Sequence, residues 1–105
     1  MPNYLLAYHG GGMPATQEEQ ARVMAAWGEW YQGLGEAVVD GGNPISRSRT
    51  IAGDGSVSPG GGPNPITGYS IIAADDMDAA VAAAKGCPIL ESGGSVEVGE
   101  IFRVV

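Results

Sequence analysis

The stretch NYLLAYHGGGMPATQEEQARVMAAWGEWYQGL (residues 3–34) decides the fold, because a strand pattern and a helix pattern follow each other in it. Residues 3–9 place apolar side chains on both faces of an extended chain, which predicts a strand covered on both sides. The glycines at positions 10–12 and Pro14 then end this strand. A helical pattern begins at Thr16.

The predicted helix spans residues 16–34. Thr16-Gln-Glu-Glu19 is a capping box, in which the threonine hydroxyl and the Glu19 carboxylate satisfy the first free amides reciprocally. Apolar residues then recur at steps of one and three, which places them along one side of a helix. They are Val23, Met24, Trp27, Trp30, Tyr31 and Leu34. Gly35 suits the left-handed residue that ends such a helix.

The middle of the chain predicts two more strands around a loop rich in glycine and proline. Residues 37–40 form the first of them, and residues 45–51 are expected to continue it beyond a Gly-Gly-Asn-Pro bend. Asp54-Gly55 indicates a hairpin turn. Residues 66–73 are apolar on both faces and form the best candidate for a central strand.

The last third predicts a second helix and a final strand. Residues 75–85 form the helix, capped by Asp75 or Asp76 and ended by Gly86 and Pro88. Its expected buried stripe is Met77, Ala80, Val81 and Ala84. Residues 95–104 form the strand, with one apolar face made of Val96, Val98, Phe102 and Val104.

This order of patterns, β-α-β-β-α-β, predicts a single α+β domain of the ferredoxin-like class over residues 1–105. Such a domain has a four-stranded antiparallel sheet with two helices on one face, which leaves the other face bare. That face still carries apolar side chains, namely Leu5, Ile101 and either Ile71 or Ile72. We therefore expect a homodimer in which two bare faces cover each other.

Composition excludes several functions. Five Lys and Arg against twelve Asp and Glu give a formal charge of −7, so we expect no binding to nucleic acid or to an anionic membrane surface. Neither a signal peptide nor a membrane span is visible, and a cytoplasmic protein is the expectation. Cys87 is the sole cysteine and is predicted to be a buried thiol. We expect no disulfide within the chain, no metal site and no cofactor.

Four segments together resemble the YCII-related proteins, and they occur in order over nearly the whole chain. They are LGEAVVDGGNP at 34–44, GYSII at 68–72, DDMDAA at 75–80 and GGSVEV at 93–98. The resemblance implies a dimeric α/β barrel of ferredoxin-like subunits. It also implies an active site with a His–Asp pair in a cleft in some members, and a likeness to enzymes acting on hydroxylated, chlorinated aromatic rings.

The chain departs from that family pattern at the catalytic pair. The first helix, where the family's histidine is expected, contains no histidine between Ala15 and Leu34. The hairpin also lacks the Asp-Gly-Pro-Phe motif of a sister group. The family's catalytic pair is therefore not transferred to this sequence.

His9 is the candidate for any proton transfer, because it is the only histidine and lies at a strand end beside three glycines. Asp40, which ends another strand of the same predicted sheet, is its candidate partner. In the alternative interpretation His9 bonds to backbone and Asp40 caps the Gly-Gly turn.

The aromatic residues are candidates for a ligand wall. Trp27, Trp30 and Tyr31 recur at helical spacing and would form a flat wall for an aromatic ligand. Tyr8 and Tyr69 would supply hydroxyl groups. The same residues equally suit a helix packing face and hydrogen bonds inside the domain.

Two functions fit these observations. One is a dimer with a small apolar, aromatic ligand cleft that performs acid–base chemistry as a lyase or isomerase. The other is a non-catalytic module that binds a metabolite or contacts another protein, and the missing helix histidine favours it.

Overall fold

The structure, a computed structural model, describes residues 1–104. Its elements in chain order are β1 (Asn3–His9), α1 (Gln17–Leu34), η1 (Gly35–Ala37), β2 (Val38–Asp40), β3 (Arg49–Ile51), β4 (Val57–Pro59), β5 (Ile66–Ala73), α2 (Met77–Ala84), η2 (Pro88–Ser92) and β6 (Ser95–Ile101). No helix in this part of the chain is long and apolar enough to cross a bilayer.

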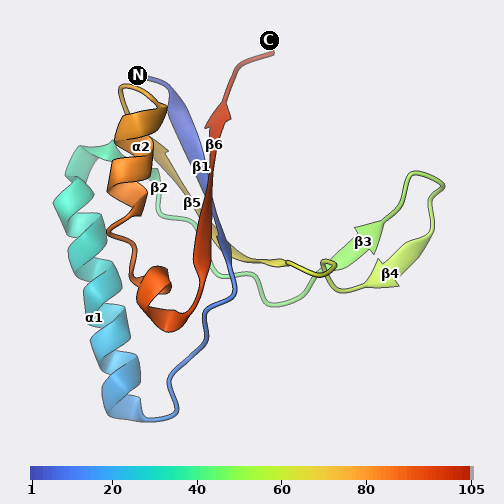
Figure 1. The fold of residues 1–105 in the computed structure, drawn as a ribbon, viewed down its shortest axis with the longest axis horizontal. Coiled ribbons are helices and arrows are strands. Elements are labelled where there is room, and N and C mark those ends of the chain that lie inside the picture. Colours follow the sequence, from blue (N-terminus) through green and yellow to red (C-terminus); the bar gives the residue numbers. More distant parts are fainter. Residues whose placement is uncertain (105) are drawn as a thin grey trace.

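The main sheet has the strand order β2-β5-β1-β6, and all of its neighbouring strands are antiparallel. Both helices lie on one side of it, and within residues 1–104 no helix or strand covers the other side (Figure 1). Apart from β3 and β4, which form a separate sheet, the helices and strands follow the order β-α-β-β-α-β. This order together with the strand arrangement is a ferredoxin-like α+β fold. The predicted fold class is confirmed.

The core lies between the sheet and the helices. Its buried side chains come from β1, β5, α2 and the segment after α2: Tyr4, Leu6, Tyr8, Ile72, Ala74, Ala80, Ala84, Cys87 and Ile89. Half-buried Trp27, Trp30 and Leu34 of α1 pack against this cluster. The expected burial of the Cys87 thiol is confirmed, since the residue is only 2% exposed.

Both helix starts follow the sequence signals. The Thr16 Oγ1 atom accepts a hydrogen bond from the Glu19 amide at 3.2 Å, and Asp76 Oδ1 accepts one from the Ala79 amide at 2.8 Å. Gly35 ends α1 with a φ of 56°, a region that glycine enters without a steric cost. The capping residues therefore fix where both helices begin.

Residues 45–51 do not continue β2, so that prediction was wrong. Pro44 makes one isolated bridge to Gly68, and the chain then leaves the sheet. Proline has no amide hydrogen and cannot extend the ladder. β3 and β4 instead pair with each other in a separate two-stranded sheet, and the predicted turn at Asp54-Gly55 joins them.

One predicted burial and the predicted end of the last strand are also wrong. Met77, at the first turn of α2, is 38% exposed, because the buried stripe starts one turn later at Ala80. Phe102 and Val104 are 77% and 84% exposed. β6 ends at Ile101, which pairs with Asn3 at the start of β1, so the residues after it have no neighbouring strand to follow.

The β3–β4 hairpin forms an arm, which we define as residues 45–65. It projects from the sheet on the side away from the helices (Figure 1). The radius of gyration is 15.1 Å, whereas a compact chain of this length has about 13 Å. The arm is thus a protrusion without a core of its own.

Candidate functional site

His9 lies at the end of β1, where the pairing with β5 is irregular. Tyr8 pairs with Gly68 but His9 pairs with Ile66, which leaves Thr67 as an extra residue on β5. The Thr67 hydroxyl lies 3.3 Å from the Tyr8 carbonyl oxygen and 3.0 Å from that of Gly10. A bulge redirects side chains locally, and here Thr67 fixes the backbone on both sides of the histidine.

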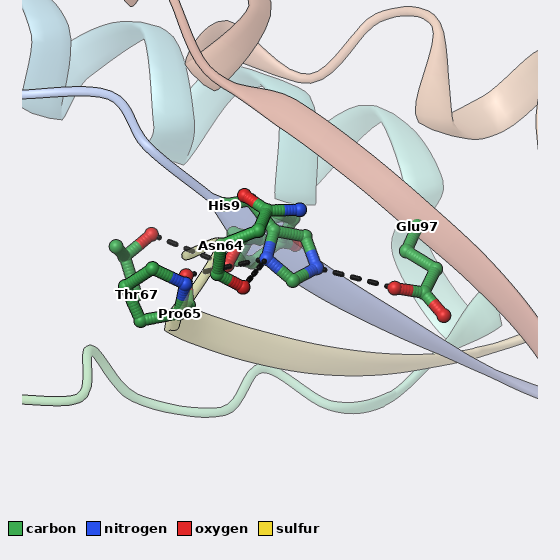
Figure 2. A network of polar contacts seen from close by, with 6 residues as sticks. His9, Asn64, Pro65, Thr67 and Glu97 are labelled. Atoms are coloured by element: carbon green, nitrogen blue, oxygen red, sulfur yellow. Dashed lines mark hydrogen bonds and ion pairs between the residues drawn. The ribbon is translucent and has the colours of Figure 1, made fainter. Parts of the chain in front are cut away.

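The imidazole ring of His9 faces acceptors at both nitrogens (Figure 2). Nδ1 lies 3.1 Å from the Asn64 carbonyl oxygen and 3.2 Å from that of Pro65. Nε2 lies 3.2 Å from Oε1 of Glu97. Because carbonyl oxygens only accept, Nδ1 carries the proton in the neutral ring and Nε2 carries the lone pair. A proton on Nε2 would in turn be donated to the Glu97 carboxylate.

His9 and Glu97 share the side of the sheet that no helix covers. Ala7 pairs with both Tyr69 and Glu97, and Leu5 pairs with Ile71, so the register puts these side chains on one face. We define the bare face by Leu5, Ala7, His9, Tyr69, Ile71 and Glu97. It is an apolar surface with one histidine and one carboxylate at its end.

Asp40 is distant from His9 within one chain. β5 separates their strands, and along β5 Asp40 pairs with Ile71 whereas His9 pairs with Ile66. These positions are about 16 Å apart along the sheet and about 10 Å apart across it. Asp40 Oδ1 instead accepts a hydrogen bond from the Gly42 amide at 2.8 Å. The two candidates therefore do not meet in a single subunit.

Tyr8, Trp27 and Tyr31 come together on the helix side of the sheet. The rings of Tyr8 and Trp27 meet edge-on, with centroids 5.2 Å apart, and those of Trp27 and Tyr31 lie 5.9 Å apart. Trp30 donates from Nε1 to the Ala83 carbonyl oxygen at 3.0 Å, which ties α1 to the end of α2. The aromatic stripe is thus part of the interface between α1 and the rest of the core.

The hydroxyl groups of this cluster form a buried network. Tyr8 donates to Ser70 Oγ at 2.7 Å, and the Tyr31 and Ser70 hydroxyls lie 2.8 Å apart. Both of those hydroxyls also lie 2.9 Å from the Gly41 carbonyl oxygen. Burial raises the pKa of Tyr8 far above its ordinary value, which keeps its phenol neutral.

The predicted site residues therefore occupy three places. His9 and Tyr69 lie on the bare face, Asp40 lies at a sheet edge, and Tyr8, Trp27 and Tyr31 lie on the helix side. The catalytic and ligand-binding roles of these six residues stay predictions. Sequence reasoning missed Glu97, although the alternation of residues 95–98 already put it on one face with Ser95.

Two surface depressions lie elsewhere. One of about 530 Å³ lies between the loop after β1, α1 and η2, and its lining includes Met13, Arg22, Val23, Ala26 and Glu91. The other, of about 420 Å³, is lined by residues 46–49 of the arm. Within residues 1–104 no three His, Cys, Asp or Glu side chains lie close enough together to hold a metal ion.

A solved structure of another protein has the same fold as this chain. It is 5-chloro-2-hydroxyhydroquinone dehydrochlorinase from Burkholderia phenoliruptrix AC1100, in complex with 2,5-dihydroxybenzoquinone. The two chains are 16% identical with a TM-score of 0.57, over 96% of this chain and 93% of that one. No curated protein sequence matches significantly.

The family comparison covers almost every element described above. The model of the YCII-related domain matches residues 4–105, from the start of β1 to the end of the chain. The resemblance stated from four sequence segments is thereby confirmed. This chain belongs to the YCII-related family.

Proposed function

We propose that this protein is a homodimer that performs acid–base chemistry, of the lyase or isomerase type, on a small hydroxylated aromatic ring. The observation that carries the proposal is the geometry of His9. Its Nδ1 is held by two carbonyl oxygens, whereas Nε2 faces the exposed Glu97 carboxylate on the bare face. A ligand that displaces this carboxylate would allow Nε2 to accept and return a proton. We also propose that the protein is cytoplasmic.

The bare face supports the homodimer. Leu5 and Ile71 lie at its centre and stay half-exposed in the single chain, and Tyr69 beside them is also half-exposed. Burying such a face against a second copy removes apolar surface from water and follows two-fold symmetry. The pair would be the α/β barrel that the family resemblance implies, and it would enclose a ligand space beside His9.

The reaction needs one proton-transferring group beside the substrate. In a lyase reaction, Nε2 accepts a proton from a ring hydroxyl while the chlorine-bearing carbon gains a proton, which converts the ring to its keto form. Loss of a second hydroxyl proton then forms another carbonyl group and expels chloride, so that the products are a quinone and HCl. In an isomerase reaction, the same proton returns to another atom of the ring. The dehydrochlorinase with the same fold acts on a ring of this chemical class, which supports the choice of substrate.

The other predicted residues keep defined places in this proposal. The Tyr69 ring would contact the ligand from the bare face. Asp40 would take part only through the second copy, because it is distant from His9 in its own chain. The aromatic cluster on the helix side of the sheet would support the bare face from the opposite side of the sheet. It consists of Tyr8, Trp27 and Tyr31.

The test is turnover of 5-chloro-2-hydroxyhydroquinone and its unchlorinated and methylated analogues, measured by chloride release and ultraviolet absorbance. His9→Gln is expected to lower turnover by about 100-fold or more. Met24→Ser, on the outer side of α1, is the matched control and is expected to keep wild-type turnover. Wild-type protein that turns over no ring in the panel, or a His9→Gln variant with full turnover, would overturn the proposal.

The 530 Å³ depression favours the second candidate, a non-catalytic module that binds a metabolite. Its volume suits a small molecule, and it combines the apolar Met13, Val23 and Ala26 with the cation Arg22. Glu19 and Glu91 also line it, so the lining carries a net negative charge and suits an apolar amine. Glu91→Gln is expected to weaken binding of such a ligand in calorimetry while His9→Gln does not, and the opposite result would favour the catalytic function.

A further inference from the structure

The arm has almost no contacts that would hold it in place. Of residues 43–66, only Ser48 is not exposed, and the aliphatic side chains of Ile51 and Val57 are 71% and 59% exposed. A two-stranded hairpin alone is marginally stable in water. A surface outside its own chain would bury these side chains and stabilise the hairpin.

The arm has two different faces. β3 and β4 pair Arg49 with Pro59, Thr50 with Ser58 and Ile51 with Val57. Because side chains alternate along a strand, Arg49, Ile51, Val57 and Pro59 share one face, and Thr50 and Ser58 share the other. We call the first the cationic–aliphatic face.

Charge complementarity identifies what fits this face. The arm contains Arg47, Arg49 and one acidic residue, Asp54. The rest of the chain contains three Lys or Arg residues and eleven Asp or Glu residues. The arm is thus the cationic part of an otherwise acidic molecule, and a second copy of this chain presents the opposite charge.

The end of the bare face offers a charge opposite to that of the arm. In the proposed homodimer the apolar centre of the bare face, with Leu5, Ala7 and Ile71, is covered by the other bare face, whereas the carboxylate of Glu97 at its end is 74% exposed. The arm projects on this side of the sheet (Figure 1). When two bare faces approach, each arm therefore extends toward the other molecule.

We infer that the arm docks on a second copy of this chain, with its cationic–aliphatic face beside the end of the bare face that carries Glu97. The inference rests on the homodimer proposed above and adds how the two copies hold each other. Since the root of the arm, Asn64 and Pro65, holds the His9 ring, docking of the arm also fixes the orientation of that ring in its own subunit.

The experiment is photocrosslinking between distinguishable copies. Ile51 is replaced by p-benzoyl-L-phenylalanine in unlabelled protein, which is mixed with nitrogen-15-labelled wild-type protein and irradiated. Mass spectrometry is expected to find dimer-sized products joining one light and one heavy chain. The same crosslinker at Met24, which is 63% exposed on α1, is the control and is expected to give none.

Sedimentation analysis separates the two possible failures. A stable dimer without light–heavy crosslinks, or with crosslinks only within one chain, would overturn the arm inference and leave the homodimer standing. A monomer at all concentrations would overturn the homodimer and the arm inference together.

Substitution gives an independent readout. Ile51→Ser with Val57→Ser is expected to raise the dimer dissociation constant by about tenfold or more, because two aliphatic side chains lose their burial. Met24→Ser removes an equally exposed apolar side chain from α1 and is expected to change nothing. Equal dissociation constants for the double variant and the wild type would contradict the inference.

Discussion

His9 and Glu97 meet across two neighbouring strands, with Nε2 and Oε1 3.2 Å apart, yet their side chains differ sharply in exposure. The His9 side chain is 9% exposed, whereas that of Glu97 is 74% exposed. The histidine is therefore held by the fold, whereas the carboxylate has few neighbours of its own chain. In the proposed function a ligand on the bare face would replace Glu97 at Nε2 and leave the backbone contacts at Nδ1 in place.

The first prediction concerns the tautomer of His9. Because Nδ1 faces the carbonyl oxygens of Asn64 and Pro65, we expect the neutral ring to carry its proton there. Nitrogen-15 NMR at alkaline pH should give a pyrrole-like shift for Nδ1 and a pyridine-like shift for Nε2. Glu97→Gln should leave this assignment unchanged, and a protonated Nε2 in the neutral ring would contradict it.

The second prediction concerns the buried hydroxyl network. Ser70→Ala removes the group that Tyr8 and Tyr31 share, which leaves the buried Tyr8 phenol without its acceptor. We expect the free energy of unfolding to fall by about 1–3 kcal/mol. Urea unfolding measures it, with the exposed Ser58→Ala as the control, expected within about 0.5 kcal/mol of wild type. Equal losses in both variants would show that the network adds no stability.

The third prediction concerns alkaline pH. Burial raises the pKa of the Tyr8 phenol above its usual 10.0 and that of the Cys87 thiol above its usual 9.0. Above these values the unfolded chain releases protons that the folded chain keeps. The free energy of unfolding should therefore fall from about pH 9 upward, by at most about 1.4 kcal/mol per pH unit for each group. Urea titrations that show constant stability from pH 9 to 11 would contradict this.

The fourth prediction concerns the chemical reactivity of Cys87. The thiol is buried in the core, and burial disfavours its reactive thiolate form. A thiol reagent such as DTNB should react with the folded protein about 100-fold or more slowly than with the urea-unfolded chain. Rapid modification of the folded protein would mean that the segment after α2 opens independently of the core.

Local signals in the sequence were enough for most of the fold. The Thr16 cap, the Asp76 cap and the strand at residues 3–9 each depend on neighbouring residues, and each is confirmed. The strand ends were harder to predict. How far β6 extends depends on where its partner β1 begins, and that length is set by a strand distant in the sequence.

The contacts within the candidate site could not be predicted from the sequence pattern alone. His9 was identifiable because it is the only histidine, but its contacts depend on pairing register and on a bulge at Thr67. Glu97 faces His9 only because β6 is the neighbour of β1, whereas β2, which carries Asp40, is two strands away. Strand order therefore decided which carboxylate meets the histidine.

The most direct test of the central claim reads proton transfer at His9 itself. Proton NMR in D₂O can follow the exchange of ring hydrogens of 5-chloro-2-hydroxyhydroquinone for deuterium, whether or not chloride leaves. Wild-type protein should accelerate this exchange, and His9→Gln, with its oligomeric state verified by sedimentation, should lose the acceleration. Equal exchange rates for the wild type and His9→Gln would contradict the account.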